Sequence, residues 1–289
     1  MNNCSNVDKK QCENCPNRDN CYGNCEDEDI NLIKNKLQCF KLILCIMCGK
    51  GGVGKSLLSV ILAQYFSEKF KTILIDLDLA GSSIPRLTNT TDYFITNVEN
   101  QFNPIKVNEL SVVSMGHIHN NISDIYTSEI KRYFIKNILK NCTMDNKEIL
   151  ILDTPPNITE EHFAIYNYIC NAKAILISTP HVLCTTELNR QFIFCQKANI
   201  DIVGIVSNMD GIRCSKCNHI NQLFSKDIIL KFCQNKYIQF LGEIEFNSQI
   251  VKNIDKGEVI HIPQLKSIYS KLLSIIMEFV PFNKKNDFN

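Results

Sequence analysis

One glycine-rich stretch carries the residues best suited to binding phosphate. It runs from Cys48 to Ser56 as Cys-Gly-Lys-Gly-Gly-Val-Gly-Lys-Ser, between an apolar run at 42–47 and apolar residues at helical spacing over 57–66. Glycines let backbone N–H groups converge on phosphate oxygens, and the start of the following helix favours an anion. A strand, a glycine-rich turn and a helix are the context of a phosphate-binding P-loop. The alternative is a glycine-rich turn followed by an incidental lysine and serine.

The side chains of this loop predict binding of a nucleotide together with magnesium. Lys55 can reach the β- and γ-phosphates, and Ser56 can ligate Mg²⁺. The residues of the loop that we expect to contact the nucleotide are Gly49, Lys50, Gly51, Gly52, Val53, Gly54, Lys55 and Ser56.

Carboxylates follow two other apolar runs that read as strands. Asp76 and Asp78 end the run at 71–78, and Asp153 ends the run at 148–153. Ligands of an open parallel sheet bind at the carboxyl ends of its strands, so these groups should meet the P-loop. Asp153 could hold Mg²⁺ through water, and Asp78 could orient the attacking water, because phosphoryl transfer depends on positioning and charge stabilisation. Each aspartate could instead cap the element that follows it.

Cysteines are concentrated at the N-terminus. The chain has 15 of them, and the first 25 residues contain five but almost no aliphatic side chains with which to build a core. The sequence Cys12, Cys15, Cys21 is a C-x2-C-x5-C run, and its C-x2-C spacing puts two thiolates on one metal-sized centre. Cys4 is the expected fourth ligand and Cys25 its rival. Spacing alone fits an iron–sulfur cluster or zinc.

A second pair of cysteines, Cys214 and Cys217, forms a C-x2-C motif. A tetrahedral metal centre needs four ligands, and this pair supplies two. Three interpretations remain open: a [4Fe-4S] cluster shared across a two-fold dimer, which we favour, zinc bound with the nearby His219, or a redox pair. The scattered cysteines are expected to be small buried hydrophobic residues; they are Cys39, Cys45, Cys48, Cys142, Cys170, Cys184, Cys195 and Cys233.

Apolar strands alternate with helices along most of the chain. This pattern predicts an α/β fold with a doubly wound, mostly parallel sheet. Expected strands are 42–47, 71–78, 110–115, 148–153, 174–179, 200–207 and 237–244, and expected helices are 125–139, 160–171, 184–198, 221–235, 248–256 and 264–280. The expected organisation is a cysteine-rich segment and solvated linker (1–36), an ATPase domain with the CxxC loop (37–282) and a polar tail (283–289).

Composition limits the partners and the compartment. The net charge is +1, which gives no electrostatic case for nucleic acid or a membrane surface. No run of 18 apolar residues and no secretory signal is present, so a cytoplasmic location is expected. The helix at 264–280 has one apolar side but little basic charge, which favours a helix docked on the sheet over a membrane-targeting helix.

The motifs together resemble, in their order, those of the Mrp/NUBP family of P-loop ATPases. They are 49–56, 76–85, 153–162, 208–217, 241–244 and 255–257, and the similarity covers roughly 12–265. The Gly-Lys-Gly-Gly-Val-Gly-Lys-Ser stretch resembles the deviant Walker A motif shared with the nitrogenase iron protein and with division-site and partition ATPases. The C-x2-C-x5-C run resembles that of the longer, eukaryotic cytosolic members.

This resemblance implies an ATPase scaffold that assembles [4Fe-4S] clusters and passes them to cytosolic and nuclear apoproteins. It implies a homodimer, or a heterotetramer with a shorter paralogue lacking the N-terminal cysteines. Lys50 would reach across the dimer to the partner's ATP, and Asn208 would contact adenine. Competing functions are a positioning ATPase on membrane or DNA and an iron–sulfur reductase. The chain departs from the family at Ser82 and Asn157, and Cys4 lies closer to Cys12 than the family places its first cysteine.

Overall fold

The computed structural model describes residues 28–79, 81–95, 97–98, 101–118, 127–214, 216–225, 227–247, 250, 252–253 and 263–279. Its strands mostly belong to one sheet, and β3 and β4 form a separate two-stranded ribbon. The strands are β1 (Leu42–Met47), β2 (Thr72–Asp76), β3 (Asn97–Val98), β4 (Gln101–Phe102), β5 (Ile105–Val107), β6 (Leu110–Val113), β7 (Ile149–Asp153), β8 (Lys173–Ser178), β9 (Asp201–Arg213), β10 (Ile220–Asn221) and β11 (Phe240–Phe246).

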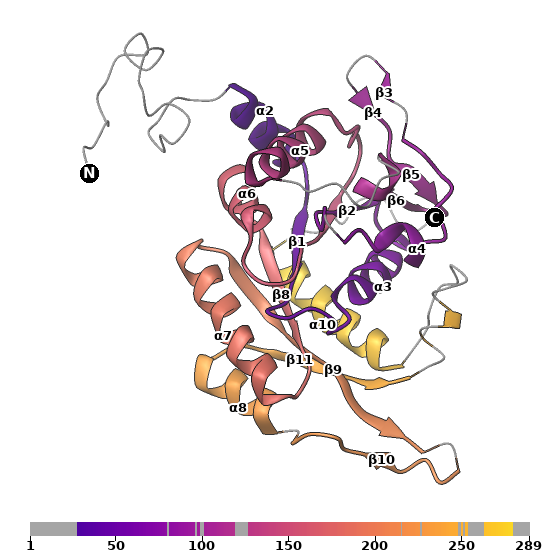
Figure 1. Ribbon diagram of the computed structural model, residues 1–289, viewed down its shortest axis with the longest axis vertical. Helices are drawn as coiled ribbons and strands as arrows, with labels where there is room; N and C mark the ends of the chain where they lie inside the picture. The colour runs from indigo at the N-terminus through magenta and orange to yellow at the C-terminus, as the bar shows by residue number, and fades with distance from the viewer. Residues whose placement is uncertain are drawn as a thin grey trace, which may run out of the picture.

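The main sheet has the order β10-β9-β8-β1-β7-β2-β6-β5, with β11 also paired to β9 (Figure 1). The strands β1, β2, β6, β7, β8, β9 and β11 pair in parallel, whereas β5 and β10 each run antiparallel to a neighbour. The central strands β1, β2 and β7 are buried along their whole length because helices cover both faces. The expected doubly wound α/β sheet is therefore confirmed.

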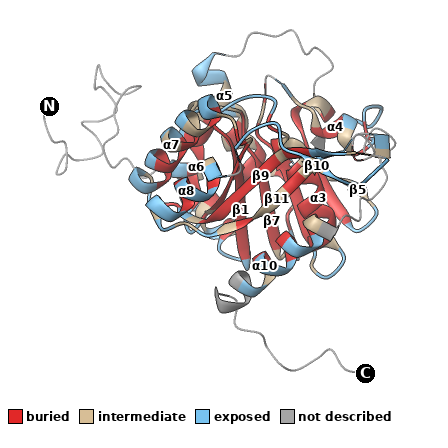
Figure 2. Ribbon diagram, turned by 90° about the horizontal axis from the view of Figure 1, so that it is seen from below, coloured by how far each residue is buried: buried red, intermediate tan, exposed pale blue. Residues whose placement is uncertain are grey.

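Helices form two layers, one on each face of the sheet (Figure 2). One hydrophobic core lies under α2, α5, α6, α7 and α8, and the other lies under α3 and α10. No helix among the described residues is long and apolar enough to cross a membrane. The helices are α2 (Glu28–Leu37), α3 (Lys55–Ser67), α4 (Ile84–Leu87), the 3-10 helix η2 (Met115–His117), α5 (Ser128–Asn141), α6 (Glu160–Tyr168), α7 (Val182–Lys197), α8 (Asp227–Lys236) and α10 (Pro263–Phe279).

The solvated linker expected before residue 37 is wrong from residue 28 onwards, because α2 occupies that stretch. Ile33 is fully buried and Leu37 is 3% exposed, one helical turn apart on the face that packs on α5. Acidic residues in the first turn and lysines in the last also suit the helix dipole. The acidic composition of this stretch obscured its apolar face. The segment 1–27 lies outside the described residues.

Strand β9 is longer than expected. The sequence predicted that it ends at 207 and is followed by a loop, whereas β9 continues to Arg213. Its pairing with β11 is irregular there, and Met209 and Gly211 have positive φ angles of 58° and 89°. The continuation also shortens the next predicted helix. Residues 220–221 form β10 against β9, and α8 begins only at Asp227.

Two of the scattered cysteines were misread as buried residues. Cys39 and Cys170 are exposed because each lies in a turn, the first between α2 and β1 and the second between α6 and β8. The other six are buried as predicted, and they are Cys45, Cys48, Cys142, Cys184, Cys195 and Cys233.

Helix α10 is docked on the sheet, as favoured from its low basic charge. Leu265, Ile268 and Leu272 are each at most 1% exposed and belong to the core under α3. Tyr269 stacks on Tyr65 of α3 at a centroid distance of 5.3 Å. The apolar side of α10 is thus occupied by the protein's own core over this stretch.

Candidate functional site

The P-loop joins the carboxyl end of β1 to the first turn of α3. Gly52 and Gly54 have φ angles of +82° and +87°, in the left-handed region where other side chains are strained. A Cβ on Gly54 would lie 2.3 Å from Asn208 Nδ2, so β9 approaches the loop too closely for a larger residue. The Asn208 amide donates a hydrogen bond to the Val53 carbonyl at 2.8 Å. The loop is therefore held from β9, while Gly52 faces open space.

Lys55 and Asp153 form the buried centre of the site. Lys55 Nζ lies 2.7 Å from Asp153 Oδ1, and the two side chains are 6% and 0% exposed. Burial alone would lower the pKa of Lys55, but Asp153 outweighs burial and raises it, so the ammonium stays charged. Ser56 and Ser59 donate hydrogen bonds to the two oxygens of Asp153, each at 2.6 Å. The Ser56 hydroxyl and Asp153 carboxylate are hard oxygen donors of the kind that Mg²⁺ prefers.

Asp76 and Asp78 join this centre from β2. Asp76 lies opposite Asp153 in the pairing of β2 with β7. Burial, followed by the charge of Asp153, raises the pKa of Asp76 to about 8, and Ser114 donates a hydrogen bond to it at 2.8 Å. Burial also raises the pKa of Asp78, but this carboxylate is half-buried. The three strand-end carboxylates therefore lie together, and Asp78 is the one that solvent reaches.

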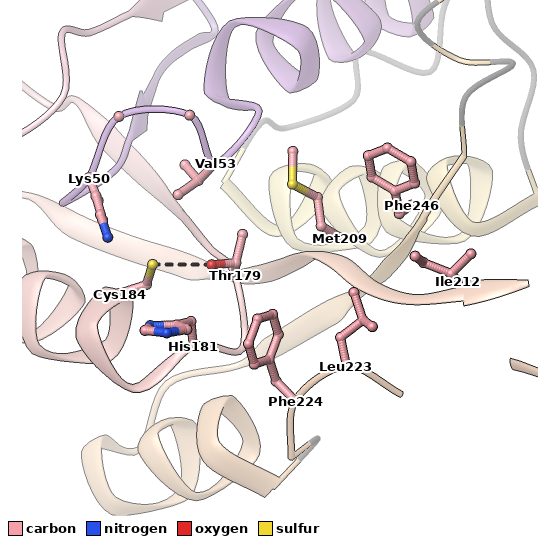
Figure 3. Close-up of a pocket in the computed structure, with 12 residues that line it drawn as sticks. Lys50, Val53, Thr179, His181, Cys184, Met209, Ile212, Leu223, Phe224 and Phe246 are labelled. Carbon is pink, nitrogen blue, oxygen red and sulfur yellow. Dashed lines mark hydrogen bonds between the residues drawn. The ribbon is translucent and has the colours of Figure 1, made fainter. Parts of the chain in front are cut away.

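A cavity of about 400 Å³ opens beside the P-loop (Figure 3). Lys50 lines it together with Thr179 and His181, from the loop after β8, and Met209 of β9. Lys50 is exposed, in contrast to the buried lysine of the same loop. Thr179 Oγ1 donates to Cys184 Sγ at 3.1 Å in the same wall. Lys50 thus lies at the cavity and is exposed, whereas Lys55 is buried.

The CxxC motif forms a compact turn at the end of β9. The Cys214 N–H donates to the His219 carbonyl at 2.8 Å, and the Asn218 N–H donates to the Cys214 carbonyl at 2.9 Å. Hydrogen bonds from the backbone of Cys217 and Lys216 lower the pKa of Cys214, which favours the metal-binding thiolate. Cys217 is exposed and Cys214 is partly exposed.

The described residues contain no group of three or more His, Cys, Asp or Glu side chains that could hold a metal ion. A zinc site formed by the CxxC and His219 of one chain is therefore not supported, since the third ligand does not converge on the thiols. The N-terminal candidates Cys4, Cys12, Cys15, Cys21 and Cys25 lie outside the described residues.

Sequence reasoning missed several residues that support these sites. Ser59 lies three residues after Ser56 and therefore on the same helix face, a spacing that could have revealed it. Gln191 of α7 donates to the Cys48 carbonyl at 3.1 Å, a contact between distant segments that no local pattern signals. Arg213, which directly precedes the CxxC, was also missed.

The sequence model of the ParA family, described as NUBPL iron-transfer P-loop NTPase, matches residues 39–280. The chain belongs to this family. A relative named cytosolic Fe-S cluster assembly factor Nubp1 homolog, from Drosophila pseudoobscura pseudoobscura, is 28% identical over 286 residues, covering 91% of this chain and 92% of the relative. The expected membership of the Mrp/NUBP group of P-loop NTPases is thereby confirmed.

Solved structures show the same fold. The nucleotide-binding protein of Archaeoglobus fulgidus, solved with ADP, has a TM-score of 0.72 and 23% identity, covering 90% of this chain and 99% of its own. The cell division ATPase MinD of Pyrococcus furiosus has a TM-score of 0.60 and 16% identity, covering 82% and 100%. A putative plasmid partition protein of Borrelia burgdorferi, bound to AMPPNP, has a TM-score of 0.58 and 20% identity, covering 82% and 98%.

Proposed function

We propose that the protein is an ATP-dependent scaffold that assembles [4Fe-4S] clusters and passes them to apoproteins of the cytosol and nucleus. The observation that carries this proposal is the course of β9. Asn208 of this strand holds the P-loop, and the strand ends at Arg213, next to the first thiol of the CxxC. A single strand thus joins the nucleotide site to the pair of thiols, which gives ATP binding a direct physical connection to the proposed cluster site. Its family and its cytosolic iron–sulfur relative agree with this function.

ATP hydrolysis is assigned to the groups around Lys55. The loop N–H groups and Lys55 bind the phosphates, while Asp78, which solvent reaches, orients the attacking water. Ser56 and, through water, Asp153 would hold Mg²⁺, and the ion would supply charge neutralisation at the phosphates. Lys50 is exposed beside the cavity and acts on the nucleotide of a partner subunit.

The cluster that is passed on is assigned to the CxxC. Two thiolates on an exposed turn are half of the ligand set of a [4Fe-4S] cluster, so a two-fold dimer completes it. The more stable cluster belongs to the N-terminal thiols Cys4, Cys12, Cys15 and Cys21. The second subunit is another copy, or a shorter paralogue without those thiols in a heterotetramer.

Anaerobic purification followed by iron, sulfide and zinc analysis tests this function. Substantial iron and acid-labile sulfide, with transfer of the cluster to an apo-acceptor, is the expected result. Metal-free protein that binds liposomes or DNA would instead indicate a positioning ATPase. Iron and sulfide without transfer, together with electron donation, would indicate a reductase.

A further inference from the structure

Arg213 is placed at the junction between β9 and the CxxC turn. It is the last residue of the strand, pairs with Ile220 of β10, and directly precedes the first thiol. Figure 1 shows β9 and β10 extending away from the helical layers at the bottom of the view. A turn at the tip of such a hairpin has little packing around it, so its shape depends on the few contacts made at its base.

The guanidinium of Arg213 makes three hydrogen bonds that join the turn to the sheet. Its Nη1 donates to the carbonyl of Asn218, inside the turn, at 3.2 Å. Its Nε and Nη2 donate to the two carboxylate oxygens of Glu245 on β11, at 2.9 Å and 2.5 Å. This bidentate geometry fixes the plane of the guanidinium, which a single point charge cannot do.

The acidic partner is itself fixed. The side chain of Glu245 is 14% exposed, and Gln264 of α10 reaches one of its oxygens at 3.4 Å. Helix α10 is anchored to the same strand by Lys271, whose Nζ donates to the Leu241 carbonyl at 2.8 Å. The contact therefore ties the turn to β11 and, through it, to the docked helix.

We propose that Arg213 is a positioning residue that pre-forms the CxxC turn before any metal arrives. By bridging the Asn218 carbonyl and the Glu245 carboxylate, it holds the turn that carries Cys214 and Cys217 in one shape within a single chain. The inference that this turn retains a cluster rests on the proposed function, but the pre-forming of the turn does not. An exposed half-site with a fixed shape accepts a cluster without paying the entropy of ordering its ligands at that moment.

Amide hydrogen exchange on the full-length, reduced, metal-free protein tests the positioning role directly. The reporters are the N–H groups of Cys214 and Asn218, which are hydrogen-bonded within the turn. In Arg213→Met we expect both N–H groups to exchange about tenfold faster, because the hydrogen bonds from the guanidinium to the Asn218 carbonyl and to Glu245 are lost. Arg213→Lys should restore only part of the protection because an ammonium cannot bridge the carbonyl and both carboxylate oxygens. Glu245→Gln should give an intermediate, roughly threefold increase.

Arg190→Met is the matched control. Arg190 forms an ion pair with Glu187 at 3.0 Å on the surface of α7, so its loss removes a comparable pair elsewhere. The control should leave exchange in the turn unchanged, and equal unfolding midpoints would show that the variants are folded. Unchanged exchange in Arg213→Met, or full rescue by Arg213→Lys, overturns the positioning role.

Iron loss from the reconstituted protein to a chelator supplies the second readout. Arg213→Met should lose the CxxC iron several-fold faster than Arg190→Met, while the iron held by the N-terminal thiols is unaffected. A wild-type rate of loss despite a loosened turn would overturn the link between turn shape and cluster retention. If the wild-type CxxC binds no iron at all, the proposed function fails there, and the exchange data still decide the role of Arg213.

Discussion

The P-loop and the CxxC turn lie near the same strand but are built in opposite ways. The nucleotide site is a buried network in which Lys55, Asp153 and two serines are joined by contacts of 2.6 to 2.7 Å. The CxxC turn is exposed, held by its own backbone and by one arginine at its base. The buried centre of the nucleotide site is formed by groups of one chain, whereas the CxxC turn supplies two thiols.

The largest expected effect is at the buried site. Lys55→Ala removes the cation of the P-loop and should weaken ATP binding about 100-fold, or ~3 kcal/mol. Lys50→Ala should keep most of the binding yet stop hydrolysis, since the proposed target of this exposed lysine is the partner's phosphate. Calorimetric titration with a non-hydrolysable analogue and a phosphate-release assay separate the two effects.

Lys55→Ala also leaves the Asp153 carboxylate buried and without its ion-pair partner. Breaking a buried ion pair in this way destabilises proteins by about 3 kcal/mol, so the folding of the variant must be checked. Circular dichroism at the assay temperature shows whether the variant is folded. Equal losses of binding in folded Lys55→Ala and Lys50→Ala would contradict the role of Lys50 across a dimer.

The second expected effect is at the surface site. Cys214→Ala or Cys217→Ala should remove the iron of one shared cluster per dimer and weaken association about tenfold or more, because the cluster is proposed to bridge the subunits. Nucleotide binding by the isolated subunit should not change. Metal analysis measures the iron content, and light scattering measures the molar mass of the assembly, on the same samples of the wild type and both variants.

A chelator challenge sharpens this prediction. The CxxC cluster, with exposed edges and only two ligands per subunit, should be lost before the N-terminal cluster. A monomeric wild type that keeps metal at the CxxC would rule out bridging, and so would variants that lose iron but dimerise as strongly as the wild type.

The buried region was the more predictable of the two. The strand end at Asp153 and the P-loop were predicted directly, because continuous apolar runs and glycines leave strong local signals, whereas the strand predicted over 71–78 ends at Asp76. Helix α2 was missed because its acidic residues concealed a narrow apolar face on Ile33 and Leu37. No chemical role was predicted for Asp76. In the structure it accepts a hydrogen bond from Ser114, 38 residues away, a contact that no local pattern signals.

The surface region was less predictable because its contacts are long-range. The motif located the thiols, but the extension of β9 past residue 207 depends on pairing with β11 and β10, which no local pattern records. Asn208 was expected to contact adenine from its resemblance alone. Its hydrogen bond to Val53 is a tertiary contact, and the role toward adenine stays a prediction.

A third prediction compares a glycine from each region. Gly54→Ala should lower the free energy of unfolding by about 2 kcal/mol and impair ATP binding, since φ is +87° and the new Cβ would meet Asn208 Nδ2 at 2.3 Å. Gly211→Ala, with φ +89° and a Cβ 2.8 Å from Ile220, should distort the hairpin and speed exchange in the CxxC turn while sparing nucleotide binding.

Gly51→Ala is the control for the unfolding measurements, because its Cβ would meet only Pro156, at 4.0 Å. Its free energy of unfolding should stay within about 0.5 kcal/mol of the wild type. Urea unfolding and analogue binding measure the three variants. Impaired ATP binding in Gly211→Ala as severe as in Gly54→Ala would show that the two regions are not separable.

The last prediction concerns pH and again involves the buried region. His162, in the first turn of α6 after the Asp153 loop, accepts a hydrogen bond from the Thr159 N–H through Nδ1, and burial lowers its pKa from 6.5 to about 4. Between these values the unfolded chain binds a proton that the folded chain does not, so stability is present above the unfolded pKa and is lost as pH falls towards 4. When the pH falls from about 7.5 to about 5, this difference in protonation should lower the free energy of unfolding by about 2 kcal/mol.

Urea unfolding of the wild type and of His162→Gln at both pH values measures the difference, and the variant should lose about 2 kcal/mol less on acidification. Equal pH dependence of the two proteins would show that His162 is not held neutral in the fold, and the acid sensitivity of the buried region would then have to come from another group.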